Sequence, residues 1–227
     1  MGVTRMMGRA LPLRGRLLVP VCLSAALAGC GPADRADDAA TSAEAGVVVS
    51  EIGPHSTYRG AELATPYAMP HVTLTASNGR AFDLVRDTTR PVTVVFFGYT
   101  HCDDECPIVM SDLTAAIAHL PQHVRDQTQL LYITTDPGRD NPQTLRTYLD
   151  RYSDSFVGLT GGRAQIVSAA QSMGVPIGAS ERLPGGGYDV GHGVQVIGFR
   201  EDSAPVVWTQ GTPVEDLVAD ITTLAGP

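Results

Sequence analysis

The sequence predicts an α/β fold, in which helices cover a sheet that contains parallel strands. Between about residues 91 and 173, short runs of β-branched and aromatic residues alternate with longer stretches whose apolar residues recur at helical spacing. The end of the chain, residues 194–224, has the pattern strand, strand, helix. Alternating strands and helices pack as a sheet with parallel neighbours and with helices on its faces.

The first 29 residues have the features of a secretory signal peptide. They hold four Arg and no acidic residue, and residues 17–28 form an apolar run. A helix of that length spans about 18 Å, which is short for a hydrocarbon core of about 30 Å. Residues 27–30 read LAGC and resemble a bacterial lipobox. The resemblance implies cleavage before Cys30, lipidation of Cys30 and a membrane-anchored, extracytoplasmic protein. An ordinary secretory peptide or an uncleaved anchor is the alternative, and both also imply export.

Export limits which cysteines remain available. Cys22 leaves with the signal peptide and lipid takes Cys30, so Cys102 and Cys106 are the remaining thiols, in a compartment where disulfides can persist. Residues 31–50 are small and acidic without periodicity. We therefore expect a flexible tether over residues 30–62 and a folded domain over residues 63–227.

The charge distribution argues against one class of partner. All 16 basic residues are Arg, against 24 acidic residues, and residues 30–227 hold only 12 of the Arg. Because an acidic surface repels phosphate, we expect no nucleic-acid partner.

The domain is predicted to open with irregular chain, including Thr65 and Pro66, and then a β-hairpin. Residues 72–75 and 81–84 flank Asn78-Gly79, a strong turn signal. Residues 91–98 form a continuous β-branched and aromatic run, which fits a strand buried on both faces.

A helix follows Cys106, with Pro107 in its first turn, where the missing N–H costs nothing. Asn141 is a candidate N-cap, with Pro142 behind it. The remaining predicted elements are strands at 130–134, 156–159, 194–199 and 205–209, and helices at 141–152, 163–173 and 213–224. The closing strand–strand–helix unit is what a thioredoxin-like domain would show, with the N-terminal β-hairpin as an addition.

Cys102 and Cys106 lie between the buried strand and the following helix. Sites form at the carboxyl ends of such strands, and helix N-termini stabilise thiolates. The acids between the two thiols act against thiolate formation. In a helix, residues i and i+4 share a face, so the two sulfurs could hold one metal or, with adjustment, form a disulfide. Two thiolates suit Cu(I) or zinc, with imidazole as the expected type of third donor.

Three segments of the chain resemble the Sco/SenC family. Residues 96–107 read FFGYTHCDDECP, which resembles the family's aromatic-Gly-Tyr-Thr-His-Cys-x-x-x-Cys-Pro motif. Residues 135–142 read TDPGRDNP, similar to the family's Asp-Pro-x-Arg-Asp segment. Residues 188–192 read YDVGH, similar to the segment that carries its copper-binding His. The order agrees, and the similarity covers roughly residues 66–224.

The resemblance implies a thioredoxin-like fold and a copper-binding metallochaperone. It implies delivery of copper to the binuclear copper site of cytochrome c oxidase, or reduction of the cysteines of that site. Cys102 and Cys106 would be copper ligands and redox thiols, and His192, in a Gly-flanked loop, the third ligand. Asp136 would be the acidic residue that acts on the site from nearby. We expect copper as Cu(I), and as client the copper-site subunit of cytochrome c oxidase or another extracytoplasmic copper protein.

The chain departs from the family pattern beside the ligands. Asp103 stands where the family usually has Pro, and Gly191 and Gly193 stand where it tends to have bulkier residues. The ligands are intact, so these changes bear on affinity, redox potential and partner. Weaker candidate donors are His101, Met110 and Met69.

An extracytoplasmic thiol–disulfide oxidoreductase with no obligate metal is the main alternative. Its usual Cys-x-x-Cys spacing differs from the spacing here, which counts against it. A dual role, with thiols that bind copper and also reduce a partner disulfide, is compatible with the residues. A peroxidase or a Cys2His zinc hydrolase has less support, since the acids disfavour a thiolate and no paired general base is evident.

Overall fold

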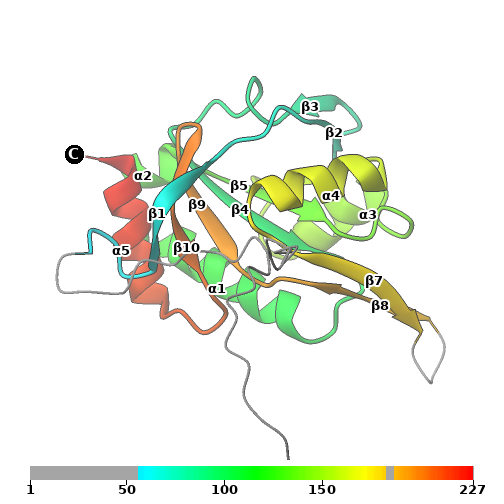
Figure 1. Ribbon diagram of the computed structural model, residues 1–227. Coiled ribbons are helices and arrows are strands. Elements are labelled where there is room, and N and C mark those ends of the chain that lie inside the picture. The colour runs from blue at the N-terminus through cyan, green and yellow to red at the C-terminus, as the bar shows by residue number, and fades with distance from the viewer. Residues whose placement is uncertain (1–55, 183–186, 227) are drawn as a thin grey trace, which may run out of the picture. The chain divides into compact units, whose positions relative to one another are not determined.

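The computed structural model describes residues 56–182 and 187–226 (Figure 1). The predicted signal peptide, Cys30 and residues 30–55 of the predicted tether lie outside the described residues. No helix within the described ranges is both long enough and apolar enough to cross a lipid bilayer.

The described domain is built on one eight-stranded sheet. Three neighbouring strands at its centre, β4, β5 and β6, run parallel, and the other pairings are antiparallel. The strands in order across the sheet are β1 (Ala61–Ala68), β10 (Ser203–Trp208), β9 (Val196–Arg200), β4 (Val92–Gly98), β5 (Thr128–Thr134), β6 (Val157–Thr160), β2 (Thr73–Ala76) and β3 (Ala81–Asp83).

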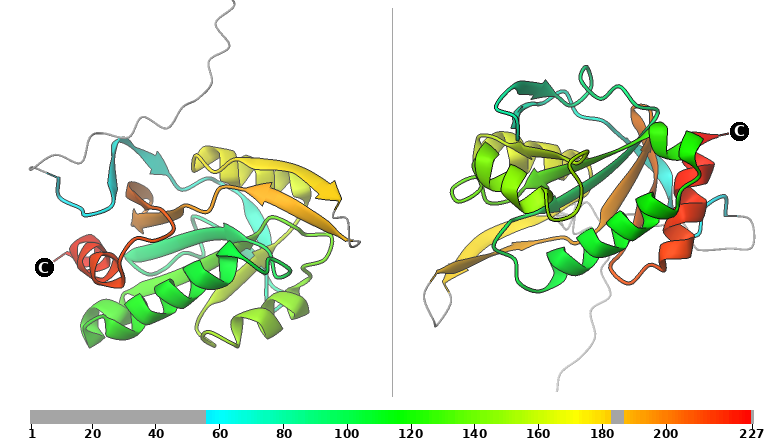
Figure 2. Two further views of the ribbon diagram at one scale, coloured as in Figure 1. Left: turned by 90° about the horizontal axis from the view of Figure 1, so that it is seen from below. Right: turned by 180° about the vertical axis from the view of Figure 1, so that it is seen from behind.

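Helices cover both faces of this sheet. They are α1 (Glu105–His119), α2 (Gln122–Asp126), α3 (Pro142–Leu149), α4 (Arg163–Ser172) and α5 (Val214–Ala225). Strand β4 shows how two cores arise, because alternate side chains of a strand point to opposite faces. Val94 and Phe96 pack in the core that includes α1, α3 and α5, whereas Val95 and Phe97 pack in the core that includes α4. Figure 2 shows α1 and α5 side by side on one face and α4 on the other.

The predicted α/β, thioredoxin-like fold with an added N-terminal hairpin is confirmed. Strands β2 and β3 pair antiparallel, and β2 also pairs with β6, so the hairpin extends the main sheet at one edge. Its turn contains Gly79 at φ +81°, in the left-handed region that favours glycine. The side chain of Asn78 accepts a hydrogen bond from Arg80 N at 3.0 Å, which closes the turn.

Two expectations about individual elements were wrong. The chain around Thr65 and Pro66 is not irregular but lies within β1. An edge strand tolerates proline, because its outer N–H groups need no partner in the sheet, and the pairing of β1 shifts register between Glu62 and Tyr67. The helix after Asn141 ends at Leu149 and not near residue 152.

The segment that carries His192 also differs from the prediction. Two strands that the sequence did not indicate, β7 (Ile177–Arg182) and β8 (Tyr188–His192), form a separate antiparallel hairpin. His192 is therefore the last residue of a strand, not part of a Gly-rich loop. Most side chains of this hairpin are exposed, so it lacks the apolar alternation by which a strand is recognised in sequence.

Candidate metal centre

The parallel pairing of β4 and β5 brings two loops together at the carboxyl edge of the sheet. Gly98, at the end of β4, is in register with Thr134, at the end of β5. Thr135 N donates a hydrogen bond to Gly98 O at 2.7 Å, just beyond the last pair. The loop with Cys102 and the loop with Asp136 therefore begin side by side.

Asp140 fastens these two loops to each other. Its carboxylate is fully buried and accepts hydrogen bonds from Thr100 N at 2.9 Å, Thr100 Oγ1 at 2.5 Å and Thr134 Oγ1 at 2.6 Å. These bonds fix the backbone two residues before Cys102. The sequence analysis did not single out Asp140, and its place inside the segment 135–142 was the one available signal.

Cys106 lies in the first turn of α1 and is fully buried. The absence of a side chain at Gly98 makes room for it, since a Cβ there would lie 3.1 Å from Cys106 Sγ and 2.7 Å from Tyr132 Oη. Cys106 N donates to Cys102 Sγ at 3.4 Å, and both cysteines are free thiols. The helix thus begins at Glu105, between the cysteines, and its first turn places both sulfurs at its N-terminus.

His192 approaches the cysteines from β8, 86 residues further along the chain. Its Nδ1 lies 2.9 Å from Gly193 O, so a proton on Nδ1 leaves Nε2 with a free lone pair. Nε2 lies 3.6 Å from Cys106 Sγ. An imidazole nitrogen and a thiolate sulfur that bind one zinc-sized ion lie about 3.5–3.8 Å apart, given bond lengths of about 2.1 and 2.3 Å. The spacing of these two atoms fits a shared metal ion.

The donors are neighbours but do not yet have the geometry of a coordinated ion. In the ranges that the structure describes, no group of three or more His, Cys, Asp or Glu side chains has the spacing of a metal site. Cys102, Cys106 and His192 instead interact through hydrogen bonds. Coordination of one ion by all three would require the cysteine side chains to reorient.

The two thiols have opposite tendencies to ionise. The side chain of Cys106 donates to Cys102, and this bond, together with His192 and two backbone N–H groups, lowers the pKa of Cys102 against the effect of burial. The same bond and burial raise the pKa of Cys106. We had expected the intervening acids to disfavour a thiolate. For Cys102 the hydrogen bonds prevail, and the pair holds one proton, on Cys106.

The same hydrogen bonds act on the imidazole. Burial favours the neutral ring of His192, but the Cys102 side chain and the carbonyl of Gly193 outweigh that effect and raise its pKa. A soft cation that binds here would compete with protons for both Cys102 and His192, because metal ligands must be deprotonated.

The site opens to the surface through a hollow of about 300 Å³. Cys102 and His192 line it, and so do the acidic residues Asp103, Asp104 and Glu105. Cys102 is half-buried, whereas Cys106 lies behind it in the core. The hollow therefore combines exposed carboxylates with the half-buried sulfur of Cys102.

Asp136 contacts Arg139 in its own loop and Tyr188 in β8. It accepts a hydrogen bond from Tyr188 Oη at 2.9 Å and forms an ion pair with Arg139 Nε. Tyr188 is in the same strand as His192. The sequence singled out Asp136 but not the two tyrosines, Tyr99 and Tyr188, that surround Arg139, although both occur in the segments of family resemblance.

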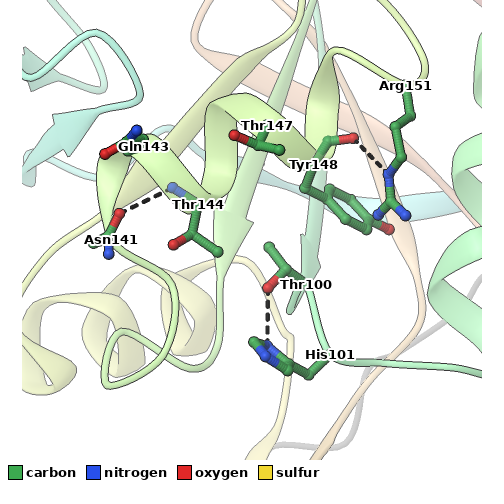
Figure 3. A pocket seen from close by; sticks show the side chains of 8 residues that line it. All are labelled: Thr100, His101, Asn141, Gln143, Thr144, Thr147, Tyr148 and Arg151. Carbon is green, nitrogen blue, oxygen red and sulfur yellow. Dashed lines mark hydrogen bonds between the residues drawn. The ribbon is translucent and has the colours of Figure 1, made fainter.

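The weaker candidate donors lie elsewhere. Met110 is fully buried in the core under α1, and Met69 is buried in the opposite core. His101 lines the hollow at the thiols, but its Nδ1 lies 3.0 Å from Thr100 Oγ1 and 3.8 Å from Asp140 Oδ1. A second hollow of about 520 Å³ separates Thr100 and His101 from residues of α3 and contains neither cysteine (Figure 3). The larger of these two hollows therefore does not contain the candidate metal centre, which is identified by the thiols.

Comparison with known proteins identifies the family. The SCO1/SenC family model matches residues 61–226. A protein from Stutzerimonas stutzeri whose name proposes copper binding is 40% identical over 99 residues, which cover 44% of this chain and 48% of that protein. The chain thus matches less than half the length of this relative.

Solved structures share the fold. The copper-bound structure of ScoI from Bradyrhizobium japonicum has 26% identity and a TM-score of 0.60, over 70% of this chain and 97% of that one. A structure of BsSco, described as a member of the Sco family of cytochrome c oxidase assembly proteins with a disulfide switch, has 20% identity and a TM-score of 0.56, over 70% and 94%. Since the family model matches residues 61–226, well over half of the chain, the chain belongs to the SCO1/SenC family.

Proposed function

We propose that the protein binds one copper ion, as Cu(I), through Cys102, Cys106 and His192 and transfers it to another copper protein. The observation that carries the proposal is the meeting of three soft or borderline donors from two distant segments at the open edge of the sheet. Two thiolates and one imidazole suit Cu(I) and not a hard cation. The copper-bound relative of the same fold supports the choice of metal.

The exposure of the proposed ligands indicates how copper could be transferred to an acceptor. Cys102 is half-buried and lies at the surface of the hollow, so an incoming thiolate of an acceptor can replace it first. His192 sits on a hairpin outside the main sheet, so its bond to the metal can be exchanged without disturbing the core. As client we propose the subunit of cytochrome c oxidase that holds its binuclear copper site, in line with the family described for BsSco.

Copper retention tests this proposal. The purified full chain is loaded with Cu(I) without oxygen and then exposed to a competing chelator. We expect one retained copper per chain, and a loss of affinity of about 10-fold or more in His192→Ala. His101→Ala is the matched control, because His101 is next to Cys102 but its Nδ1 contacts Thr100, and this variant should retain copper like the wild type. Retention that is indifferent to His192, or no retention, would contradict the proposal.

A second candidate function has an observation of its own in its favour. Both thiols are free, one favours the thiolate and the other the thiol, which is the arrangement that attacks a disulfide. In that reaction the Cys102 thiolate attacks a partner disulfide, and Cys106 then closes a disulfide with Cys102. Two electrons pass to the partner, which leaves with two thiols. This activity needs no ligand at His192, so His192→Ala should reduce it much less than it reduces copper retention.

We also propose that the protein acts outside the cytoplasm, with residues 1–29 as signal peptide, Cys30 lipidated and a tether before the functional domain. The sequence analysis assigned residues 30–62 to the tether and 63–227 to the domain, but Ala61 and Glu62 already belong to β1. The support is the pattern of charge, apolar run and small residues before Cys30. Incorporation of labelled fatty acid into the full chain, and its loss in Cys30→Ala, is the expected result. Equal labelling of both would contradict lipidation at this residue.

A further inference from the structure

The hairpin that carries His192 belongs to its own two-stranded sheet. Strands β7 and β8 pair only with each other within the described residues, and most of their side chains are exposed. Figures 1 and 2 show the hairpin projecting away from the eight-stranded sheet. Something other than sheet pairing must therefore hold His192 against the cysteines.

Arg139 occupies the gap between this hairpin and the main fold. Its guanidinium carbon lies 3.8 Å from the ring centroid of Tyr188 in β8 and 5.6 Å from that of Tyr99 in the loop after β4. Its Nε pairs with Asp136, while its Nη2 is buried without a hydrogen-bond partner in the described residues. The two aromatic faces are thus the compensation for burying that end of the cation.

Asp136 and Tyr99 complete the connection. Asp136 accepts from Tyr188 Oη at 2.9 Å, so one carboxylate holds both Arg139 and Tyr188. The hydroxyl of Tyr99 donates to Asp189, the next residue of β8. Charge-assisted bonds of this kind are the strong ones in proteins.

The residues in these contacts are close to the imidazole of His192. Tyr188 and His192 are four residues apart in one strand, so their side chains lie on the same face of the hairpin. The ring of Tyr99 packs edge-on against that of His192, with centroids 5.8 Å apart. Tyr99 therefore touches Arg139 on one side and His192 on the other.

We propose that Arg139, stacked between Tyr99 and Tyr188, is a positioning residue that holds the β7–β8 hairpin so that His192 reaches the two cysteines. This inference rests on the proposed function, in which His192 is a copper ligand. Arg139 does not touch the metal. It acts by keeping the hairpin closed, which raises the fraction of molecules in which the third donor is in place.

Copper release gives the first test. We expect Arg139→Gln in the full chain to lose Cu(I) to a competing chelator about 10-fold faster than the wild type. Arg151→Gln is the matched control, because Arg151 also stacks on a tyrosine, 4.5 Å from the centroid of Tyr148, but outside the hairpin. In a His192→Ala background, Arg139→Gln should have no further effect. An equal effect in both backgrounds would overturn the inference, since Arg139 would then act by another route.

Hydrogen exchange of the metal-free protein gives a test that needs no copper. Arg139→Gln should raise exchange at the amides of residues 188–192 and leave those of β4 and β5 unchanged. Tyr188→Phe, which keeps the ring but loses the bond to Asp136, should do the same to a smaller extent and serves if Arg139→Gln fails to fold.

The two experiments distinguish failure of the proposed function from failure of the positioning role. A wild type that retains no copper, or retains it without His192, contradicts the proposed function, and the positioning role at a copper site falls with it. The second failure concerns the positioning role alone. It is overturned if copper retention by the wild type depends on His192, but Arg139→Gln and Tyr188→Phe match the wild type in copper release and in hydrogen exchange.

Discussion

Cys102 and Cys106 differ more in surroundings than their identical side chains suggest. Cys102 is half-buried at the wall of an open hollow, and Cys106 is fully buried in the core. Hydrogen bonds lower the pKa of Cys102, to about 3, while burial and the bond to Cys102 raise that of Cys106. Only the first is both accessible and ionised, which is the requirement for a reactive cysteine.

This asymmetry predicts the order of alkylation. In the metal-free protein, iodoacetamide at pH 6 should modify Cys102 first and leave Cys106 unmodified until the domain unfolds. At that pH an ordinary thiol is almost entirely protonated, whereas a thiol with lowered pKa is ionised and reactive. Mass spectrometry of peptides from the modified protein measures the ratio. Equal modification of the two cysteines in the folded protein would show that they are not differentiated.

The sequence was most informative at the candidate metal ligands. Cys102, Cys106 and His192 were chosen from residue type, spacing and resemblance, and the structure brings all three together. Arg139, Tyr99 and Tyr188 could not be grouped in the same way. Their contacts join three segments separated by tens of residues, and no local pattern encodes which tyrosine ring stacks on which guanidinium.

Among the elements, those with a strong local signal were predicted well. Strand β4 is buried at every position, as its unbroken β-branched and aromatic run indicated. Asn141 caps α3 by accepting from Thr144 N at 2.9 Å. Strands β1, β7 and β8 and the short helix α2 were missed. These strands lie at a sheet edge or on an exposed hairpin, where few apolar side chains are buried and proline or glycine interrupts the pattern.

Strand β4 also makes the cysteine site sensitive to a single methyl group. In Gly98→Ala the new Cβ would lie 2.7 Å from Tyr132 Oη and 3.1 Å from Cys106 Sγ, and both neighbours are buried. We expect a loss of about 1–3 kcal/mol in the free energy of unfolding and weaker copper retention, because the thiol must move. Urea unfolding and chelator competition measure these effects.

Gly191→Ala is the control for that substitution. A Cβ at Gly191 meets nothing within 4 Å, although the residue is next to His192. We expect it to unfold like the wild type, within about 0.5 kcal/mol. If Gly98→Ala is equally harmless, the close approach of β4 to Cys106 does not constrain the site.

At the scale of the whole domain, one buried carboxylate ties the first described segment to the last helix. Asp220 in α5 accepts hydrogen bonds at 2.8 Å from Arg59 N, Gly60 N and Trp208 Nε1. Asp220 and Trp208 are each only 1% exposed, so these donors have no ready replacement in water. The chain immediately before β1 is thereby held against the sheet and α5.

Loss of this carboxylate should destabilise the domain without touching the metal centre. We expect Asp220→Ala to lower the free energy of unfolding by at least about 2 kcal/mol, since buried donors are left unpaired. Asp150→Ala, which removes an exposed carboxylate paired with Arg146, is the control and should change stability by less than about 1 kcal/mol. Equal effects of the two substitutions in urea unfolding would show that the Asp220 bonds carry no net stability.

The central claim concerns the molecule as a whole, since it needs a loop, a helix and a hairpin to supply one coordination sphere. X-ray absorption at the copper edge of the Cu(I)-loaded full chain tests it most directly. The account predicts two sulfur ligands and one nitrogen ligand, with the nitrogen lost in His192→Ala and retained in His101→Ala. A wild-type copper bound by sulfur alone, or a nitrogen ligand that survives His192→Ala, would contradict it.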